Sequence, residues 1–173
     1  MNILIVDDHA VVREGYKALL NAMMPDCRIF DAENGAQTHR LLASSDIEIL
    51  ILDINLSNES GLVLAKIFLK RHPDLKIILA HLGHPWQTDC LSVVRKHKNV
   101  WADVSAQFYR PYSFWQGMRL FYEWGCTEKI LFASDWPVTN PKDSISHLRN
   151  LPKFAIDHNL PEIPEKEIEG IIN

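Results

Sequence analysis

The chain has 173 residues, of which 47% are hydrophobic and 23% are charged; this composition excludes fibrous and disordered proteins and fits one domain with a sizeable core. Its 18 Lys and Arg residues against 22 Asp and Glu give a formal charge of -4, so the composition favours neither a nucleic acid nor a membrane as a partner. Three widely spaced cysteines suit the reduced thiols of the cytoplasm. No uncharged apolar run approaches the roughly 18 to 20 residues of a membrane span, and the first residues, MNILIVDDH, lack the basic start of a signal peptide. We therefore expect a cytoplasmic protein.

Short runs rich in β-branched residues alternate with longer amphipathic stretches along the chain. The six predicted strands cover 3–6, 28–30, 49–52, 76–80, 100–104 and 129–133. Nearly continuous apolar strands such as IEILILDI indicate a sheet that is buried on both faces. Because strands and helices alternate, we expect an α/β fold with a parallel sheet and helices on both faces.

The last third of the chain is punctuated by prolines. These predict short helices over 144–150, 153–158 and 165–172. Before them, Gly125 follows the apolar segment SFWQGMRLFYEW and is expected to end a helix.

Three carboxylates follow two of the predicted strands. Asp7 and Asp8 come after the first strand and Asp53 after the third, and ligands of parallel α/β sheets bind beyond the carboxyl ends of strands. Crowded carboxylates repel one another, which favours a raised pKa or a hard cation such as Mg²⁺. The alternative is that they are ordinary strand-end and helix-capping residues. We favour a metal site because three lie together.

At these residues the chain resembles the receiver domain of a two-component response regulator. Residues 1 to about 78 carry the resemblance, in ILIVDDH, ILILDINL and SNESGLVLAKIFLKRHPDLKII. The resemblance implies that Asp7 and Asp8 help to hold Mg²⁺, and that Asp53 is the phosphoacceptor that takes a phosphoryl group from a histidine kinase.

Two parts of the receiver pattern are missing. The fourth strand of a receiver ends in Ser or Thr, whereas this chain reads Leu79-Ala80-His81. The fifth strand of a receiver ends in Lys, whereas this chain reads Asp103-Val104-Ser105. Any phosphorylation response is therefore expected to be feeble.

From about residue 73 onwards the chain is similar to the carboxyl-terminal part of a metal-dependent amidohydrolase (β/α)8 barrel. The matching segments are HPDLKIILAHLGHPW, KNVWADVSA, EKILFASDWPVTNP and IPEKEIEGIIN. The resemblance implies that His81 is a metal ligand and that Asp135 is a metal ligand or a base, with His84 and Ser105 beside them. Zinc or manganese at His81 and Asp135 is the corresponding metal prediction, and we consider either metal less favoured than Mg²⁺ at the acidic cluster.

The amidohydrolase pattern is also incomplete. Such enzymes carry a His-x-His pair on their first barrel strand, and the eight histidines of this chain include no such pair. His81 is alternatively a hydrogen-bonded residue at a strand end, and Asp135 is alternatively a turn residue. Since both catalytic sets are incomplete, we expect no enzyme.

The segment HPDLKII fits both families, which makes it a natural junction. We interpret the chain as an engineered chimera that folds as one hybrid domain over 1–173, with 1–78 derived from a receiver and 79–173 from an amidohydrolase barrel. The expected fold is flavodoxin-like, with strand order 2-1-3-4-5 and one added edge strand. A partly curled half-barrel is the alternative, and the added edge allows a homodimer.

Three functions remain open at this point. The first is a designed fold without an evolved function, which keeps weak Mg²⁺ binding and a weak phosphoacceptor at Asp53. The second is a receiver that works with a histidine kinase. The third is a remnant metal-dependent amidohydrolase.

Overall fold

The computed structural model describes residues 1–136 and 138–173, and it divides into two compact units. Unit 1 is Met1–Leu79 and unit 2 is Ala80–Asn173. The division falls one residue beyond the junction predicted after residue 78. That the two units behave as a single hybrid domain stays a prediction, which their unfolding can test.

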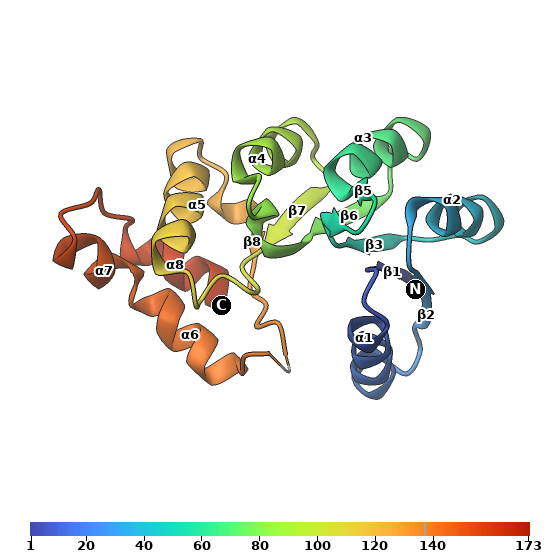
Figure 1. Ribbon diagram of the computed structural model, residues 1–173, viewed down its shortest axis with the longest axis horizontal. Helices are drawn as coiled ribbons and strands as arrows, with labels where there is room; N and C mark the ends of the chain where they lie inside the picture. Colours follow the sequence, from blue (N-terminus) through green and yellow to red (C-terminus); the bar gives the residue numbers. More distant parts are fainter. Residues whose placement is uncertain (137) are drawn as a thin grey trace. The chain divides into compact units, whose positions relative to one another are not determined.

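Unit 1 is a parallel sheet with helices on both faces (Figure 1). Its elements are β1 (Asn2–Val6), α1 (Ala10–Met23), β2 (Arg28–Ala32), α2 (Gly35–Ser44), β3 (Ile49–Leu52), β4 (Asn55–Leu56), β5 (Glu59–Ser60), α3 (Gly61–Arg71) and β6 (Lys76–Leu79). The long strands pair in the order β2-β1-β3-β6, all parallel. The first four predicted strands and their flavodoxin-like order are therefore confirmed.

The core of unit 1 follows from the register of its strands. Leu4 lies opposite Leu50, and Leu50 lies opposite Ile77, so the three side chains share one face of the sheet. All three are fully buried, as is Phe68 of α3. Because side chains alternate between the faces of a strand, the other face is available to α1, and Figure 1 places α1 and α3 on opposite sides of these strands. Continuous apolar strands are required for such burial on both sides.

Unit 1 also contains a short antiparallel hairpin that the sequence did not predict. It pairs β4 with β5, with Asn55 opposite Ser60 and Leu56 opposite Glu59. Strands of two residues are too short to produce a periodic pattern, so no signal in the sequence marks them.

Unit 2 continues the alternation of strands and helices. Its elements are a 3-10 segment (Ala80–Gly83), α4 (Gln87–Lys96), β7 (Val100–Asp103), α5 (Pro111–Glu123), a 3-10 turn (Thr127–Lys129), β8 (Ile130–Leu131), α6 (Pro141–Arg149), α7 (Leu151–Asp157) and α8 (Glu165–Ile172). β7 and β8 pair in parallel, with Asp103 opposite Leu131. The described residues of the chain form no closed barrel.

Two predicted boundaries in unit 2 were wrong. The strand predicted over 129–133 is only two residues long, because its partner β7 ends at Asp103, opposite Leu131, and leaves nothing for later residues to pair with. The helix predicted from residue 144 begins at Pro141, with the side chain of Asn140 accepting a hydrogen bond of 2.9 Å from the Asp143 N–H. Asn followed by Pro is a helix-start signal that the prediction overlooked.

The remaining helix predictions for unit 2 agree with the structure. α7 and α8 lie within a residue or two of the predicted ranges. Gly125 adopts a φ of 62° just after α5, which is the left-handed conformation of a helix end. Pro137, part of the SDWP segment, lies outside the described residues.

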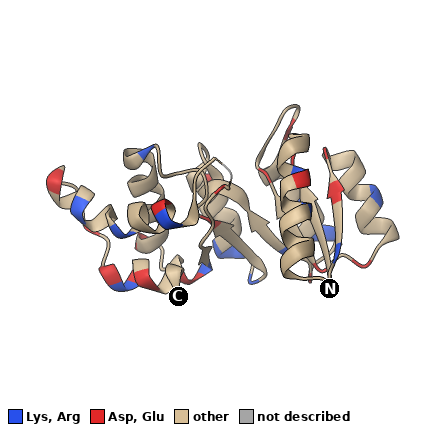
Figure 2. Cartoon of the chain, turned by 90° about the horizontal axis from the view of Figure 1, so that it is seen from below, with Lys and Arg blue, Asp and Glu red and all other residues tan. Residues whose placement is uncertain are grey.

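Charges of both signs are scattered over each unit, in keeping with the small net charge (Figure 2). Among the described helices, none combines the length and apolar character needed to cross a membrane.

Candidate functional site

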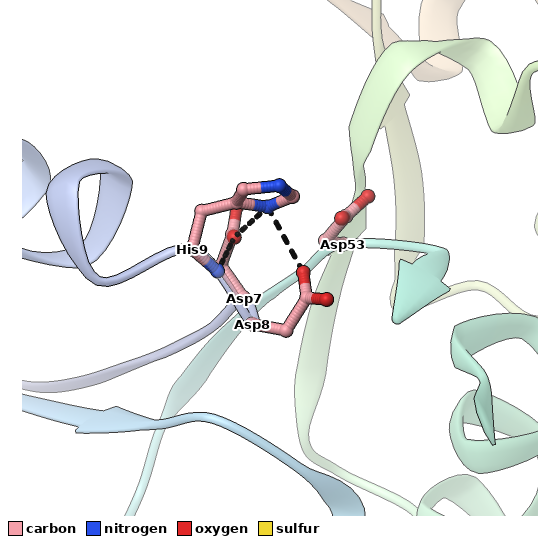
Figure 3. Close-up of side chains that lie close together, drawn as sticks. All are labelled: Asp7, Asp8, His9 and Asp53. Atoms are coloured by element: carbon pink, nitrogen blue, oxygen red, sulfur yellow. Dashed lines mark hydrogen bonds and ion pairs between the residues drawn. The ribbon is translucent and has the colours of Figure 1, made fainter. Parts of the chain in front are cut away.

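The predicted acidic residues meet at one edge of the sheet of unit 1. Asp7 directly follows β1 and Asp53 directly follows β3, and the two strands end side by side with Val6 opposite Leu52. Asp7, Asp8, His9 and Asp53 each bring one ligand atom to within 4.8 Å of the others (Figure 3). Searched over residues 1–136 and 138–173, the chain has no other such group of three or more His, Cys, Asp or Glu.

His9 also belongs to this cluster, although it was not among the predicted site residues. Its backbone N–H donates to Asp7 Oδ1 at 2.7 Å, and its ring Nδ1 lies 3.2 Å from the same oxygen and 2.9 Å from Asp8 Oδ1. The ring extends over both carboxylates in Figure 3, while Asp53 approaches from the end of β3. The signal that was available is adjacency, since His9 directly follows the two aspartates.

The cluster shifts the pKa values of its members in different directions. Burial, reinforced by the charge of Asp53, raises the pKa of Asp7 despite its hydrogen bonds from His9. Burial alone would also raise the pKa of Asp8, but the Ser57 hydrogen bonds and the charge of His9 outweigh it and lower that pKa. The Asp8 charge, together with the hydrogen bond to Asp7, raises the pKa of His9. The site therefore concentrates negative charge and attracts a positive group.

The two carboxylate oxygens of Asp8 have different surroundings. Its Oδ2 accepts a hydrogen bond from the Ser57 backbone N–H at 3.1 Å and a second from the Ser57 hydroxyl. Its Oδ1 is buried and, apart from the close approach of His9, accepts no hydrogen bond. A buried carboxylate oxygen without a hydrogen-bond donor is energetically costly unless a cation approaches it.

The backbone holds Asp53 in place. Its N–H donates to the Val6 carbonyl at 2.8 Å, which ties the end of β3 to β1. Its side-chain Oδ1 accepts a weak hydrogen bond of 3.3 Å from the Asn55 N–H. The Gly61 N–H donates to the Ile54 carbonyl at 3.0 Å and so closes the loop that starts at Asp53. The carboxylate is half-buried, which leaves it accessible to a small ligand.

The residues of this cluster fit a hard divalent cation. Three carboxylates supply the oxygen ligands that Mg²⁺ prefers, and Oδ1 of Asp8 accepts no hydrogen bond, with only the His9 ring close to it. Asp7, Asp8 and Asp53, the three predicted metal ligands, are therefore brought together as expected.

The predicted hydrolase residues lie in unit 2. His81 is half-buried at the start of unit 2, and its Nδ1 is 2.7 Å from the Ser105 hydroxyl. Its backbone N–H donates to Asp103 Oδ1 at 3.1 Å. Asp103 was overlooked as a partner of His81, because the two residues are 22 positions apart and on different elements. The hydrogen-bonded environment agrees with the alternative interpretation of His81 as a satisfied strand-end residue.

Asp135 occupies a turn. It has a φ of 66°, and its carbonyl accepts hydrogen bonds from the N–H groups of Val138 at 2.8 Å and Thr139 at 3.3 Å. Within the described chain, His81 and Asp135 are not part of a group of three or more metal-ligating side chains. A zinc or manganese site at these residues thus stays a prediction.

The structure also locates the two gaps in the receiver pattern. β6 ends at Leu79 and is followed by Ala80, so no hydroxyl stands at the position of the receiver Ser or Thr. β7 ends at Asp103 and is followed by Val104 and Ser105, so no Lys stands there either.

Comparisons with known proteins match the two parts of the chain to two families. The amidohydrolase family model matches residues 58–172, and the response regulator receiver domain model matches residues 3–85. The matches overlap over 58–85, a segment that includes the predicted junction.

Individual relatives match the receiver part. The aerobic respiration control protein ArcA of Escherichia coli K12 is 42% identical over 65 residues, which are 38% of this chain and 26% of ArcA. The chain thus spans about a quarter of the length of that relative.

Two solved structures show how far the likeness extends along this chain. The response regulator TrrA of Thermotoga maritima, in complex with Mg²⁺-BeF, is 30% identical to this chain. The match covers 57% of this chain and 83% of the TrrA chain, with a TM-score of 0.49. A signal receiver domain of an HD domain-containing protein from Pseudomonas fluorescens Pf-5 has a TM-score of 0.52 over 91% of this chain and 90% of its own, at 16% identity. The second likeness supports the flavodoxin-like fold.

The chain belongs to the amidohydrolase family through residues 58–172, which are more than half of it, and it carries a response regulator receiver sequence over residues 3–85.

Proposed function

We propose that the chain is an engineered chimera without an evolved function of its own, and that unit 1 keeps weak Mg²⁺ binding and a weak phosphoacceptor. The observation that carries the proposal is the meeting of Asp7, Asp8 and Asp53 within 4.8 Å at one sheet edge. Both parent families place functional residues at the carboxyl ends of parallel strands, so a strand of one can follow a strand of the other. In this chain, the receiver part lacks the Lys and the Ser or Thr, and the amidohydrolase part lacks the His-x-His pair.

The chemistry of the proposed phosphoacceptor is a displacement at phosphorus. An oxygen of the Asp53 carboxylate attacks the phosphorus of an acyl phosphate, the bond from phosphorus to the acyl oxygen breaks, and the donor leaves as a carboxylate. Bound Mg²⁺ supplies positive charge that offsets the charge of the phosphoryl oxygens. Asp8, held by Ser57, and Asp7 would hold the ion beside Asp53. Because the receiver Lys and hydroxyl are missing, fewer groups bind the phosphoryl oxygens of phosphorylated Asp53. We therefore propose weak phosphoacceptor activity.

Magnesium titration tests the metal site. Isothermal calorimetry of the full chain with MgCl₂ should give one weak site, and Asp8→Asn or Asp53→Asn should weaken it by about tenfold or more, since each removes a charged ligand. Asp74→Asn is the matched control, because Asp74 is exposed and lies in unit 1 outside the cluster. Equal affinity in the wild type and in both cluster variants would refute the site.

Phosphate incorporation tests the phosphoacceptor. With a radiolabelled acyl phosphate and Mg²⁺, the wild type should become labelled slowly, and Asp53→Asn should remain unlabelled. A histidine kinase is the partner that the receiver resemblance implies, and label transfer from a phosphorylated kinase is the corresponding assay. Labelling that persists in Asp53→Asn would place the phosphoryl group elsewhere.

A remnant amidohydrolase is the second candidate, favoured by the family match over 58–172 and by the ordered His81 side chain. It predicts that Zn²⁺ or Mn²⁺ binds through His81 and Asp135. Equilibrium dialysis with each metal should then show a loss of binding in His81→Gln. Absence of binding in the wild type would eliminate this candidate.

A homodimer is also proposed, at the edge of the added strand. Within the described chain, β8 pairs with β7 alone, so its other edge has no strand partner. Light scattering after size exclusion should give twice the monomer mass of 19.9 kDa, and a monomer at all concentrations would contradict it.

A further inference from the structure

A single carboxylate oxygen organises the start of unit 2. Oδ1 of Asp103 accepts hydrogen bonds from the backbone N–H groups of His81, at 3.1 Å, and Ser105, at 2.9 Å. An oxygen that accepts from two N–H groups is acting as an acceptor and does not carry a proton. The Ser105 hydroxyl contacts this same oxygen, so the hydroxyl must be the donor in that contact.

The direction of this bond determines where the proton of His81 lies. Ser105 has one hydroxyl hydrogen, and Asp103 receives it. The Ser105 oxygen, 2.7 Å from His81 Nδ1, is then left with lone pairs and accepts from the ring. Ser105 is 1% exposed and Asp103 is 4% exposed, so water does not take the place of either partner. In the neutral ring the hydrogen is on Nδ1, and Nε2 carries a lone pair.

A second histidine, three residues later, is held in the opposite way. Nδ1 of His84 lies 3.0 Å from the Gln87 side-chain nitrogen and 3.0 Å from the Ser113 hydroxyl. An amide nitrogen only donates, so Nδ1 of His84 accepts, and the ring hydrogen is on Nε2. Burial, with the nearby charges of Arg110 and His81, lowers the pKa of His84, which favours the neutral ring.

The backbone between the two histidines is fixed by the structure around it. His81, Leu82 and Gly83 are all left-handed, with φ of 62°, 51° and 79°. Such conformations are costly for residues with a side chain and persist only where neighbouring groups enforce them. At Gly83 the side chain of Cys90 leaves no space for a Cβ. The two rings are therefore held by a rigid segment rather than by a free loop.

We propose that the segment AHLGH holds two imidazoles with opposite proton positions: Asp103 and Ser105 leave a lone pair on His81 Nε2, while Gln87 and Ser113 leave an N–H on His84 Nε2. A lone pair binds a metal ion or an acidic proton of a ligand, whereas an N–H binds an oxyanion. Asp103 and Ser105 act through His81, and Gln87 and Ser113 act through His84, so all four are positioning residues. The proposal concerns unit 2 and does not depend on the magnesium site of unit 1.

Nitrogen NMR measures the tautomers directly. Long-range ¹H–¹⁵N correlation spectra of the full chain, labelled with ¹⁵N-histidine and recorded at one pH of about 8, separate protonated from unprotonated ring nitrogens. His81→Gln and His84→Gln assign the two rings. We expect the Nδ1–H form for His81 and the Nε2–H form for His84. The Nε2–H form at His81, or the Nδ1–H form at His84, in the wild-type spectrum assigned in this way would overturn the proposal.

Two variants test the positioning residues. Ser105→Ala should move His81 towards the Nε2–H form, which an unpartnered histidine favours, and leave the His84 signals unchanged. Ser113→Ala is the matched control, because it removes a hydroxyl from the other ring and should leave His81 unchanged. A spectrum of Ser105→Ala in which His81 keeps its Nδ1 hydrogen would remove Ser105 from the assignment. Ser105→Thr, which keeps the hydroxyl, should keep the wild-type tautomer.

Discussion

The carbonyl oxygen of Asp53 lies in the space that a side chain on Gly61 would need. A Cβ at position 61 would also collide with the backbone of Ile54, so the first residue of α3 packs directly against the loop that carries Asp53, the proposed phosphoacceptor. The geometry of the proposed metal site therefore depends on a residue that contributes no side chain.

Gly61→Ala should disturb this loop. We expect a loss of roughly 1 to 3 kcal/mol in the free energy of unfolding, because backbone atoms cannot move aside as a flexible side chain can. Mg²⁺ affinity should fall as well, as Asp53 shifts with its backbone. Urea unfolding followed by circular dichroism, together with calorimetry, measures both effects.

Gly15→Ala is the control for that substitution. Gly15 lies inside α1 with no atom near its missing Cβ, so alanine should stabilise the helix by about 0.5 to 1 kcal/mol. Mg²⁺ affinity should be unchanged. Similar behaviour of the two glycine variants would contradict the close packing at Gly61.

Lys129→Met should destabilise unit 2. The Lys129 ammonium donates to the carbonyls of His97, Lys98 and Val100, at 2.7, 2.9 and 3.1 Å, and so satisfies the backbone between α4 and β7. Loss of a charged donor to several carbonyls should cost roughly 2 to 3 kcal/mol.

Tryptophan fluorescence during urea unfolding measures this cost, because all five tryptophans lie in unit 2. Lys142→Met is the matched control, since Lys142 is exposed. An unchanged midpoint for Lys129→Met would show that the three carbonyls do not need the ammonium.

The stability of unit 2 should depend on pH through His97. Burial, with the charges of Lys96 and Lys129, lowers the pKa of the His97 ring below its ordinary value. Between that lowered pKa and about 6.5, the value in an unfolded chain, the unfolded chain binds the proton more readily. Stability contributed by His97 is therefore present above pH of about 6.5 and is lost as the pH falls.

Urea midpoints measured at several pH values check this sign. His97→Gln should flatten the part of the profile below neutral pH. A wild-type profile in which unit 2 gains stability on acidification through this window would contradict the lowered pKa.

The three cysteines should differ in reactivity. Cys90 is fully buried, and burial with the charge of Asp103 raises the pKa of its thiol. Burial also raises the pKa of Cys126, whereas Cys27 is only half-buried. Because the thiolate is the nucleophile, iodoacetamide should label Cys27 first and Cys90 last. Mass spectrometry of the digested chain follows the labelling, and equal rates at Cys27 and Cys90 would be inconsistent with the packing.

The sequence predicted the sheet of unit 1 well, because continuous apolar strands buried on two faces leave a strong pattern. The strand over 49–52 has the same ends in the structure. It predicted β8 poorly, because the length of an edge strand is set by its partner and not by its own apolar residues.

The candidate sites divide in the same way. Asp7 and Asp53 were found because each directly follows a predicted strand, and Asp8 because it follows Asp7, so topology alone brings the three together. His9 was missed because an exposed residue at a helix start has no periodic signal. The contact of Asp103 with His81 was missed because it depends on the local turn at Ala80–Gly83, which has no counterpart in the apolar pattern.

We propose that the two pieces, which match different families, fold as one cooperative domain. Phe68 is fully buried in unit 1, and its replacement by alanine should cost about 3 to 5 kcal/mol. The five tryptophans report on unit 2 alone. Phe121→Ala, in the core of unit 2, is the positive control that must lower the tryptophan-detected midpoint in any case.

The most direct measurement is the thermal unfolding of Phe68→Ala followed by tryptophan fluorescence. If the chain is one cooperative domain, the midpoint should fall by roughly 10 °C, although the substitution lies in the other unit. A midpoint equal to that of the wild type, with a separate earlier transition in circular dichroism, would contradict the claim.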